Sequence, residues 1–132
     1  MDRLFLDANV LFSAAYRANA GLARFWKLSK VVLLSSLYAL EEARANLSEE
    51  AQKKRLEVLA KSLQLVEAVS QGLPPSILLP EKDNPILLAA IAGQATHLLT
   101  GDLRHFGPYF GKTIQGVLIA SPAMYLQTRQ KQ

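Results

Sequence analysis

The hydrophobic positions of the chain form short apolar runs that alternate with stretches of helical periodicity. Each apolar run is rich in aliphatic residues and is bounded by polar residues or turn signals, so each predicts a strand. The predicted strands cover residues 3–6, 31–34, 65–69, 96–100 and 117–120. The predicted helices cover residues 10–17, 22–29, 37–47, 49–63, 85–94 and 122–128. Asn9 and Ser36 are suited to cap the helices that follow them.

Strands that alternate with helices are typical of a parallel sheet with helices on both faces. The helix over 85–94 is apolar all round, so it is expected to be deeply buried. Residues 72–82 hold three prolines and are predicted to be a loop. We therefore expect one three-layer α/β/α domain with a central parallel sheet over residues 1–128. A frayed tail is expected over 129–132.

The N-terminus, MDRLFLDANV, lacks a basic region followed by a long apolar stretch, so no secretory signal is predicted. The longest apolar run, near residues 31–40, is interrupted by two serines. It is shorter than the roughly 20 apolar residues that cross a bilayer. We therefore expect a soluble cytoplasmic protein with no membrane partner.

Four acidic residues fall at the edge of the predicted sheet where ligands usually bind. Asp7 ends the first strand and Asp102 follows the fourth, and the carboxyl ends of parallel strands meet at one edge. Asp83 precedes the buried helix, whose N-terminus is expected at the same edge. Glu42 lies within two turns of the start of the helix after the second strand, and periodicity does not distinguish it from Glu41. These four acids can therefore converge on one edge of the sheet.

Each acid also has a purely structural explanation. Asp7 and Asp83 suit helix caps, Asp102 suits a glycine turn, and a lone exposed Glu is usually only solvated. Convergence favours a site, because clustered carboxylates raise one another's pKa values unless a cation is present. The chain has no Cys and only two His, so Mg²⁺ or Mn²⁺ with oxygen ligands is favoured over zinc. Such an ion can activate a bound water for attack on a phosphodiester.

The segments around these acids resemble the PIN-domain family of metal-dependent ribonucleases, which includes VapC-like toxins of bacterial toxin–antitoxin pairs. LFLDANVLFSA is similar to the family's opening strand with its Asp-x-Asn signature, and LLSSLYALEEARANL to its second strand and helix. KDNPILLAA and HLLTGDLRHFG resemble the segments that carry the third and fourth acids. The family's Glu falls six residues after a Ser, and this spacing from Ser36 selects Glu42 over Glu41. The resemblance spans essentially the whole chain.

This resemblance implies an endoribonuclease that depends on one or two Mg²⁺ or Mn²⁺ ions and is the toxin of a type II toxin–antitoxin pair. It implies catalytic and metal-ligating roles, direct or through water, for Asp7, Glu42, Asp83 and Asp102. It implies supporting roles for Asn9, which would orient Asp7, for Thr100, which would hold the Asp102 loop, and for Ser36. Helix capping is the simpler explanation for Ser36.

Some family members carry a further acid shortly after the fourth, and here no acid follows Asp102 in the sequence LRHF. The number of ions is therefore left open. Arg104 and His105 are candidate substrate contacts, although a packing or loop role is the commoner explanation for a histidine such as His105.

The charge of the chain is compatible with RNA as a partner. The net charge is +4, from 15 basic and 11 acidic residues. If four acids hold a metal, the rest of the chain has 15 basic and seven acidic residues. A mainly basic protein would then surround an acidic metal site. Exposed apolar residues on the helices over 10–28 and 37–63 could bind an antitoxin or a second protomer, and the resemblance suggests both.

Four other classes of protein could place acids at this edge of the sheet. A PIN fold that binds RNA or protein without cleaving would be expected to have lost one of the four acids. An RNA-processing nuclease without an antitoxin remains an alternative. A phosphatase with an Asp-x-Asp pair would need an acid at Asn9, and a receiver domain would need an acidic pair where only Asp7 stands.

Overall fold

The computed structural model describes residues 1–68 and 72–130, and these residues form a six-stranded sheet. Its strands are β1 (Asp2–Leu6), β2 (Val31–Ser35), β3 (Gln64–Leu65), β4 (His97–Leu99), β5 (Thr113–Ile114) and β6 (Val117–Ala120). Their order is β3-β2-β1-β4-β6-β5. All neighbouring pairs are parallel except β5 with β6. The predicted α/β class with a central parallel sheet is confirmed, with one antiparallel strand at an edge.

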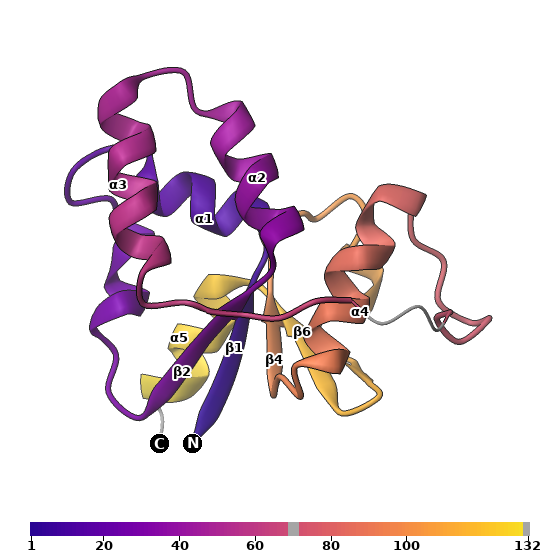
Figure 1. The fold of residues 1–132 in the computed structure, drawn as a ribbon. Coiled ribbons are helices and arrows are strands. Elements are labelled where there is room, and N and C mark those ends of the chain that lie inside the picture. Colours follow the sequence, from indigo (N-terminus) through magenta and orange to yellow (C-terminus); the bar gives the residue numbers. More distant parts are fainter. Residues whose placement is uncertain (69–71, 131–132) are drawn as a thin grey trace.

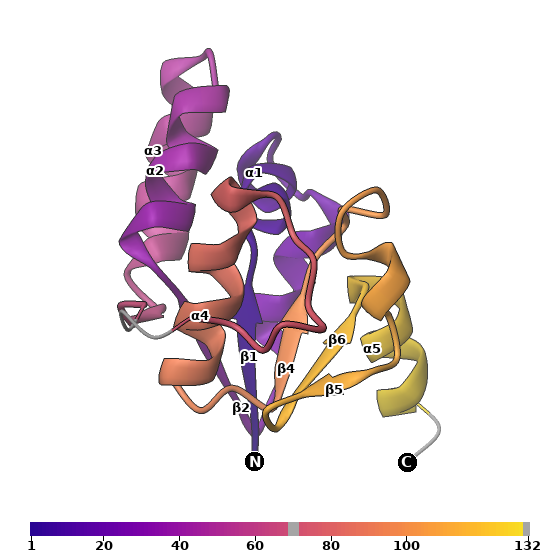
Figure 2. The ribbon, with the colours of Figure 1, turned by 90° about the vertical axis from the view of Figure 1, so that its right-hand side faces the viewer.

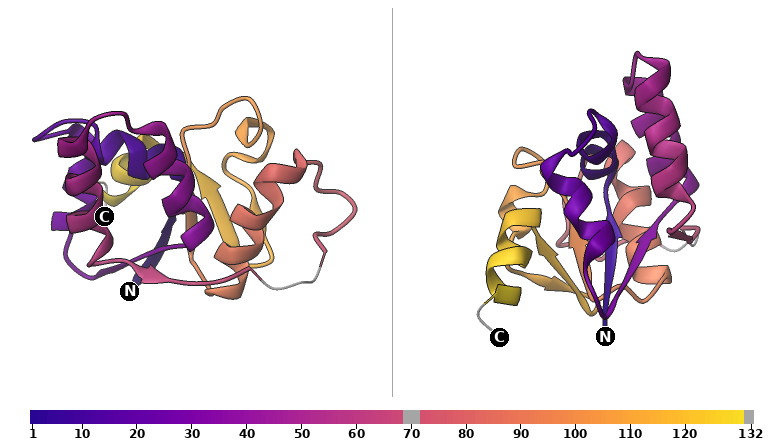
Figure 3. Two further views of the ribbon diagram at one scale, coloured as in Figure 1. Left: turned by 45° about the horizontal axis from the view of Figure 1, so that its top comes forward. Right: turned by 90° about the vertical axis from the view of Figure 1, so that its left-hand side faces the viewer.

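Helices cover both faces of this sheet. The α-helices are α1 (Ala8–Ala15), α2 (Leu37–Asn46), α3 (Glu50–Ala60), α4 (Asn84–Ala92) and α5 (Pro122–Gln130). The 3₁₀ helices are η1 (Gly21–Lys27), η2 (Glu81–Asp83) and η3 (Gly107–Tyr109). Figures 2 and 3 show α5 and η1 on one face and α4 on the other. The predicted three layers are therefore present.

The core is centred on β1 and β4, which are covered on both sides. Phe5 of β1 pairs with Leu98 of β4, and Leu98 pairs in turn with Ile119 of β6. All three side chains are fully buried. Such strands show continuous apolar runs rather than alternation, which is why the sequence reveals them clearly. Helix α4 packs Leu87 and Ala90 into this core, as its all-round apolar sequence predicts.

The edges of the sheet differ most from the sequence prediction. Strand β5 was not predicted, because its two residues are too few to show a pattern. The turn after it has positive φ at Gln115 (47°) and Gly116 (86°), which joins β5 to β6 in a tight hairpin. Strand β3 is Gln64–Leu65, so it overlaps the predicted strand over 65–69 only at Leu65, and position 69 lies outside the described residues.

Three helix boundaries also need correction. Helix α1 begins at Ala8 because Asp7, and not Asn9, is its N-cap. The predicted helix over 22–29 is the 3₁₀ helix η1. Helix α5 continues to Gln130, so positions 129–130 of the expected frayed tail are helical, while 131–132 lie outside the described residues.

No helix in residues 1–68 and 72–130 is both long enough and apolar enough to cross a membrane.

Replacement of Leu98 by Ala tests the central position of β4. The side chain is 0% exposed, and its removal is expected to cost about 2–5 kcal/mol of unfolding free energy. Leu78→Ala is the matched control, because Leu78 is 80% exposed and its loss is expected to cost less than about 0.5 kcal/mol. Urea denaturation measures both values, and an equal loss in the two variants would contradict this description of the core.

Candidate active site

The carboxyl edge of the sheet gathers the ends of several elements. Strands β1, β2 and β4 end at this edge, and α1 and α2 begin directly after β1 and β2. Helix α4 runs back along the sheet, so its N-terminus lies at the same end of the molecule (Figure 1). The predicted acids Asp7, Glu42, Asp83 and Asp102 all lie on segments that meet at this edge.

Asp7 is fixed by hydrogen bonds to both of its carboxylate oxygens. Its Oδ1 accepts from the backbone N–H of Ala8 (2.7 Å), which caps α1. Its Oδ2 accepts from the Thr100 hydroxyl (2.8 Å) and from Asn9 Nδ2 (3.2 Å). The residue is only 4% exposed. These bonds hold a buried carboxylate in a single orientation at the end of β1.

Burial dominates the electrostatics of Asp7. It raises the pKa of the carboxyl group from 3.8 to about 6, although the hydrogen bonds from Thr100 and Ala8 oppose the rise. The negative charges of Glu42 and Asp83 raise the pKa further. A nearby cation would offset each of these unfavourable contributions.

Asn9 and Thr100 connect Asp7 to the loop after β4. Asn9 Nδ2 donates to Thr100 Oγ1 (3.2 Å), and Asn9 Oδ1 accepts from the Gly101 N–H (2.8 Å). Thr100 Oγ1 also accepts from the Asp102 N–H (3.1 Å). Thr100 is fully buried, so its hydroxyl is shielded from water, whereas the bond from the Gly101 N–H to Asn9 is exposed. The two residues thus join the strand carrying Asp7 to the loop carrying Asp102.

Asp83 and Asp102 meet at the imidazole of His105. Asp102 Oδ1 accepts from the His105 backbone N–H (3.0 Å), which turns Asp102 Oδ2 towards the ring. His105 Nδ1 lies 2.8 Å from Asp83 Oδ2 and 3.0 Å from Asp102 Oδ2. Although these distances are short, neither His105 Nδ1 nor Asp83 Oδ2 makes a hydrogen bond with acceptable angles. Burial raises the pKa of Asp83, with Asp102 adding to the rise and His105 opposing it.

Glu42 and Glu41 lie in different surroundings on α2. Glu42 is exposed to solvent, and its charge acts on both Asp7 and Tyr38. Glu41 instead lines a small cavity between α2 and α3, together with Glu57. The structure therefore brings Glu42, and not Glu41, towards the other acids.

Tyr38 also lies at this edge, although it is not among the residues predicted from the sequence. Its hydroxyl donates to the Lys82 carbonyl (2.7 Å), which ties α2 to the segment before Asp83. Burial first, and then the charges of Glu42, Asp83 and Asp7, raise the pKa of the phenol. Tyr38 and Glu42 are four residues apart and share one face of α2. This spacing is the feature of the sequence that could have identified Tyr38 as a neighbour of the acids.

The remaining predicted residues have simpler surroundings. Ser36 Oγ accepts from the Ala39 N–H (3.1 Å) and caps α2, in keeping with its simpler explanation. Arg104 is exposed, and within the described residues it makes no side-chain hydrogen bond or ion pair.

The donor set fits a divalent metal ion. Asp83 is 9% exposed, and its buried Oδ2 has no hydrogen bond of acceptable geometry, although His105 Nδ1 lies 2.8 Å away. Ligand atoms of Asp83, Asp102 and His105 all lie within 4.8 Å of one another. Burial and the neighbouring charge of Asp102 both disfavour the ionised form of Asp83, and a cation bound there would relieve that cost. Asp83 and Asp102, with Asp7 close by, could therefore hold such an ion.

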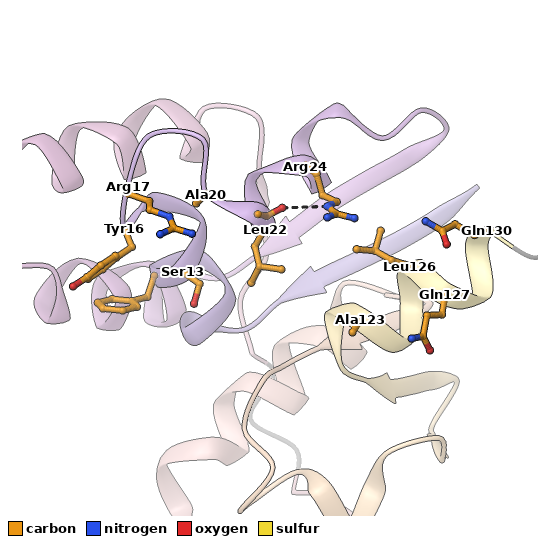
Figure 4. Close-up of a pocket in the computed structure, with 12 residues that line it drawn as sticks. Ser13, Tyr16, Arg17, Ala20, Leu22, Arg24, Ala123, Leu126, Gln127 and Gln130 are labelled. Atoms are coloured by element: carbon orange, nitrogen blue, oxygen red, sulfur yellow. Dashed lines mark hydrogen bonds between the residues drawn. The ribbon is translucent and has the colours of Figure 1, made fainter.

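A separate apolar groove lies between α1, η1 and α5. It has a volume of about 680 Å³ and is lined by residues of α1, η1 and α5, including Phe12, Leu22 and Leu126. Figure 4 shows Leu22 of η1 and Leu126 of α5 projecting from its two walls, with Arg17 and Arg24 nearby. None of the four acids lines this groove, so it is distinct from the acidic site.

The chain matches the family model described as the PIN domain over residues 3–104, and it therefore belongs to the PIN-domain family. The predicted resemblance to this nuclease family is confirmed. Among solved structures, the chain is similar to one described as "Crystal structure of VapBC2 from Rickettsia felis bound to a DNA fragment from their promoter". The TM-score is 0.68 at 15% identity, covering 90% of this chain and 98% of the other. A search of curated proteins finds no significant match.

Asp7→Asn tests the cost of burying this carboxylate. Because the pKa of Asp7 is higher in the folded than in the unfolded chain, its protonated form favours folding. The stability gained from protonated Asp7 is fully present at pH values below about 3.8, and it is lost as the pH rises through about 6. In EDTA near pH ~8, the variant is expected to be more stable than the wild type, by at most about 3 kcal/mol.

This difference is expected to shrink towards pH ~4, and urea denaturation across the range measures it. Glu81→Gln is the control, because Glu81 is exposed. A stability difference that is independent of pH would contradict the assigned cause.

Proposed function

We propose that this PIN-domain protein is a metal-dependent endoribonuclease that hydrolyses RNA phosphodiester bonds. Two observations support the proposal: ligand atoms of Asp83, Asp102 and His105 lie within 4.8 Å of one another, and the charges of Glu42 and Asp83 act on the buried carboxyl group of Asp7. The acids proposed as catalytic and metal-ligating are Asp7, Glu42, Asp83 and Asp102. Mg²⁺ or Mn²⁺ suits carboxylate oxygens, and the number of ions is one or two.

The bound cation supplies an activated water and stabilises the charge that develops at the phosphate. The protein itself holds the acidic side chains in position. Thr100 and Asn9 hold Asp7 in one orientation, and the Asp102 loop is anchored to the same hydroxyl. Glu42 is exposed and suits a contact through water, whereas buried Asp7 is already held by three donors. Basic residues outside the site favour a polyanionic substrate.

Paired substitutions on α2 test the assignment of the second acid. We expect Glu42→Gln to reduce Mn²⁺-dependent RNA cleavage by at least about 100-fold, because a positioned charge at the metal would be lost. Glu41→Gln is the matched control and is expected to retain activity, since Glu41 lies against α3. Cleavage of a fluorescent single-stranded RNA measures both variants. Equal activity of the two would contradict the role proposed for Glu42.

Metal binding is expected to stabilise the native protein. Mn²⁺ at millimolar concentration should raise the Tm, because a ligand that binds only the folded state stabilises it. Asp83→Asn and Asp102→Asn should abolish this rise, and differential scanning fluorimetry measures it. The same rise in these variants as in the wild type would place the ion elsewhere. A wild-type protein that binds RNA but shows neither a Tm shift nor cleavage would favour a binding module.

We further propose that the protein acts as a VapC-like toxin, in the cytoplasm, with an antitoxin and a second protomer as partners. Support comes from membership of the PIN-domain family and from the shared fold with a chain of the VapBC2 structure. The exposed apolar residues Leu37 and Val58 are further support, because partner surfaces commonly carry such groups.

Induced expression of the wild type is expected to arrest bacterial growth, and Asp7→Asn should not. A small reading frame beside the gene should restore growth when it is co-expressed. If neither arrest nor such a neighbour is found, while cleavage is retained, an RNA-processing role is favoured instead.

A further inference from the structure

The loop after β4 places an imidazole nitrogen where the acidic site has ligand atoms. His105 Nδ1 lies 2.8 Å from Asp83 Oδ2 and 3.0 Å from Asp102 Oδ2. The loop builds this position, because the His105 N–H donates to Asp102 Oδ1 (3.0 Å). The Asp102 N–H is in turn held by Thr100 Oγ1 (3.1 Å), within the network around Asp7. The imidazole therefore belongs to the same rigid arrangement as the acids.

These distances match those between neighbouring ligands of a single ion. Two atoms that each lie ~2.1 Å from an ion, at right angles, are about 3.0 Å apart. The two contacts of His105 Nδ1 have this separation, and all three ligand atoms lie within 4.8 Å of one another. One octahedral ion can therefore contact His105, Asp83 and Asp102 with little movement of the side chains.

When no cation is bound, His105 lies within ion-pair distance of both acids and lowers the pKa of Asp83. An imidazolium that only neutralised the acids would donate its Nδ1–H to one of their oxygens. Neither His105 Nδ1 nor Asp83 Oδ2 makes a hydrogen bond with acceptable angles, although both atoms are buried. A metal ion shared by these two buried atoms, which lie 2.8 Å apart without a well-aligned hydrogen bond, would satisfy both of them.

We infer that His105 Nδ1 is a direct metal ligand beside Asp83 and Asp102, and that this nitrogen gives the site a preference for Mn²⁺ over Mg²⁺. Imidazole binds transition metals well, whereas Mg²⁺ prefers oxygen ligands. The inference rests on the metal site of the proposed function and adds to it a nitrogen ligand and a metal preference. It also replaces the substrate contact that the sequence predicted for His105.

His97 provides an internal control, because it is the other of the two histidines in the chain. It begins β4, at the opposite end of the strand from the acidic site. Its Nδ1 lies 2.8 Å from Thr96 Oγ1, and its ring packs edge-on against Tyr125 with centroids 4.9 Å apart. His97→Gln should therefore leave the metal site intact.

The experiment is pulsed EPR of Mn²⁺ bound to the full-length protein, combined with calorimetric titration of Mn²⁺ and Mg²⁺. We expect the wild type and His97→Gln to show electron spin-echo modulation from a directly bound ¹⁴N. His105→Ala should lose this modulation. It should also bind Mn²⁺ at least ~10-fold more weakly, since loss of even an outer-shell partner costs about 10- to 100-fold. Its Mg²⁺ affinity should change less than its Mn²⁺ affinity.

The wild-type spectrum needs no variant, so it remains decisive if His105→Ala fails to fold. Tight Mn²⁺ binding without ¹⁴N modulation would overturn the inference and leave the proposed nuclease intact. Absence of Mn²⁺ binding at millimolar concentration would overturn both. Modulation that persists in His105→Ala and vanishes in His97→Gln would assign the nitrogen to the wrong histidine and overturn the inference alone.

Discussion

The burial of Asp7 at the end of β1 is the constraint on which the rest of the site depends. A carboxylate in this position is costly, and its pKa of about 6 expresses that cost. The fold offsets part of it with hydrogen bonds from Ala8, Asn9 and Thr100. Because these donors come from α1 and from the end of β4, the same bonds align two segments that are about 90 residues apart in the sequence.

This alignment extends outward from Asp7 to the other acids. Thr100 holds the backbone of Asp102, and Asp102 holds the backbone of His105. His105 then reaches Asp83, which lies at the start of α4. A chain of contacts thus leads from the buried core to the polar edge, so the sheet helps to position the side chains of the site. Positioning of this kind suits a centre that must hold several like charges close together.

The sequence predicts the central strands and the positions of the four acids well, because both depend on local patterns. Continuous apolar runs identify β1 and β4, and polar residues that follow them fall at the carboxyl edge. Periodicity does not separate Glu42 from Glu41, because both lie on one polar stretch of α2. The family's six-residue spacing from Ser36 selects Glu42, and the packing of Glu41 beside Glu57 of α3 gives the structural reason. Strand β5 and the contact between His105 and Asp83 depend on tertiary structure, and the sequence alone does not reveal them.

The central claim is that acids from separate segments form one metal site at the carboxyl edge of the sheet. The most direct test is anomalous diffraction from crystals of the protein grown with Mn²⁺. We expect an anomalous peak within bonding distance of Asp83 and Asp102, on the side that faces Asp7. A well-occupied peak elsewhere on the protein, with these carboxylates bonded only to protein or water, would contradict it.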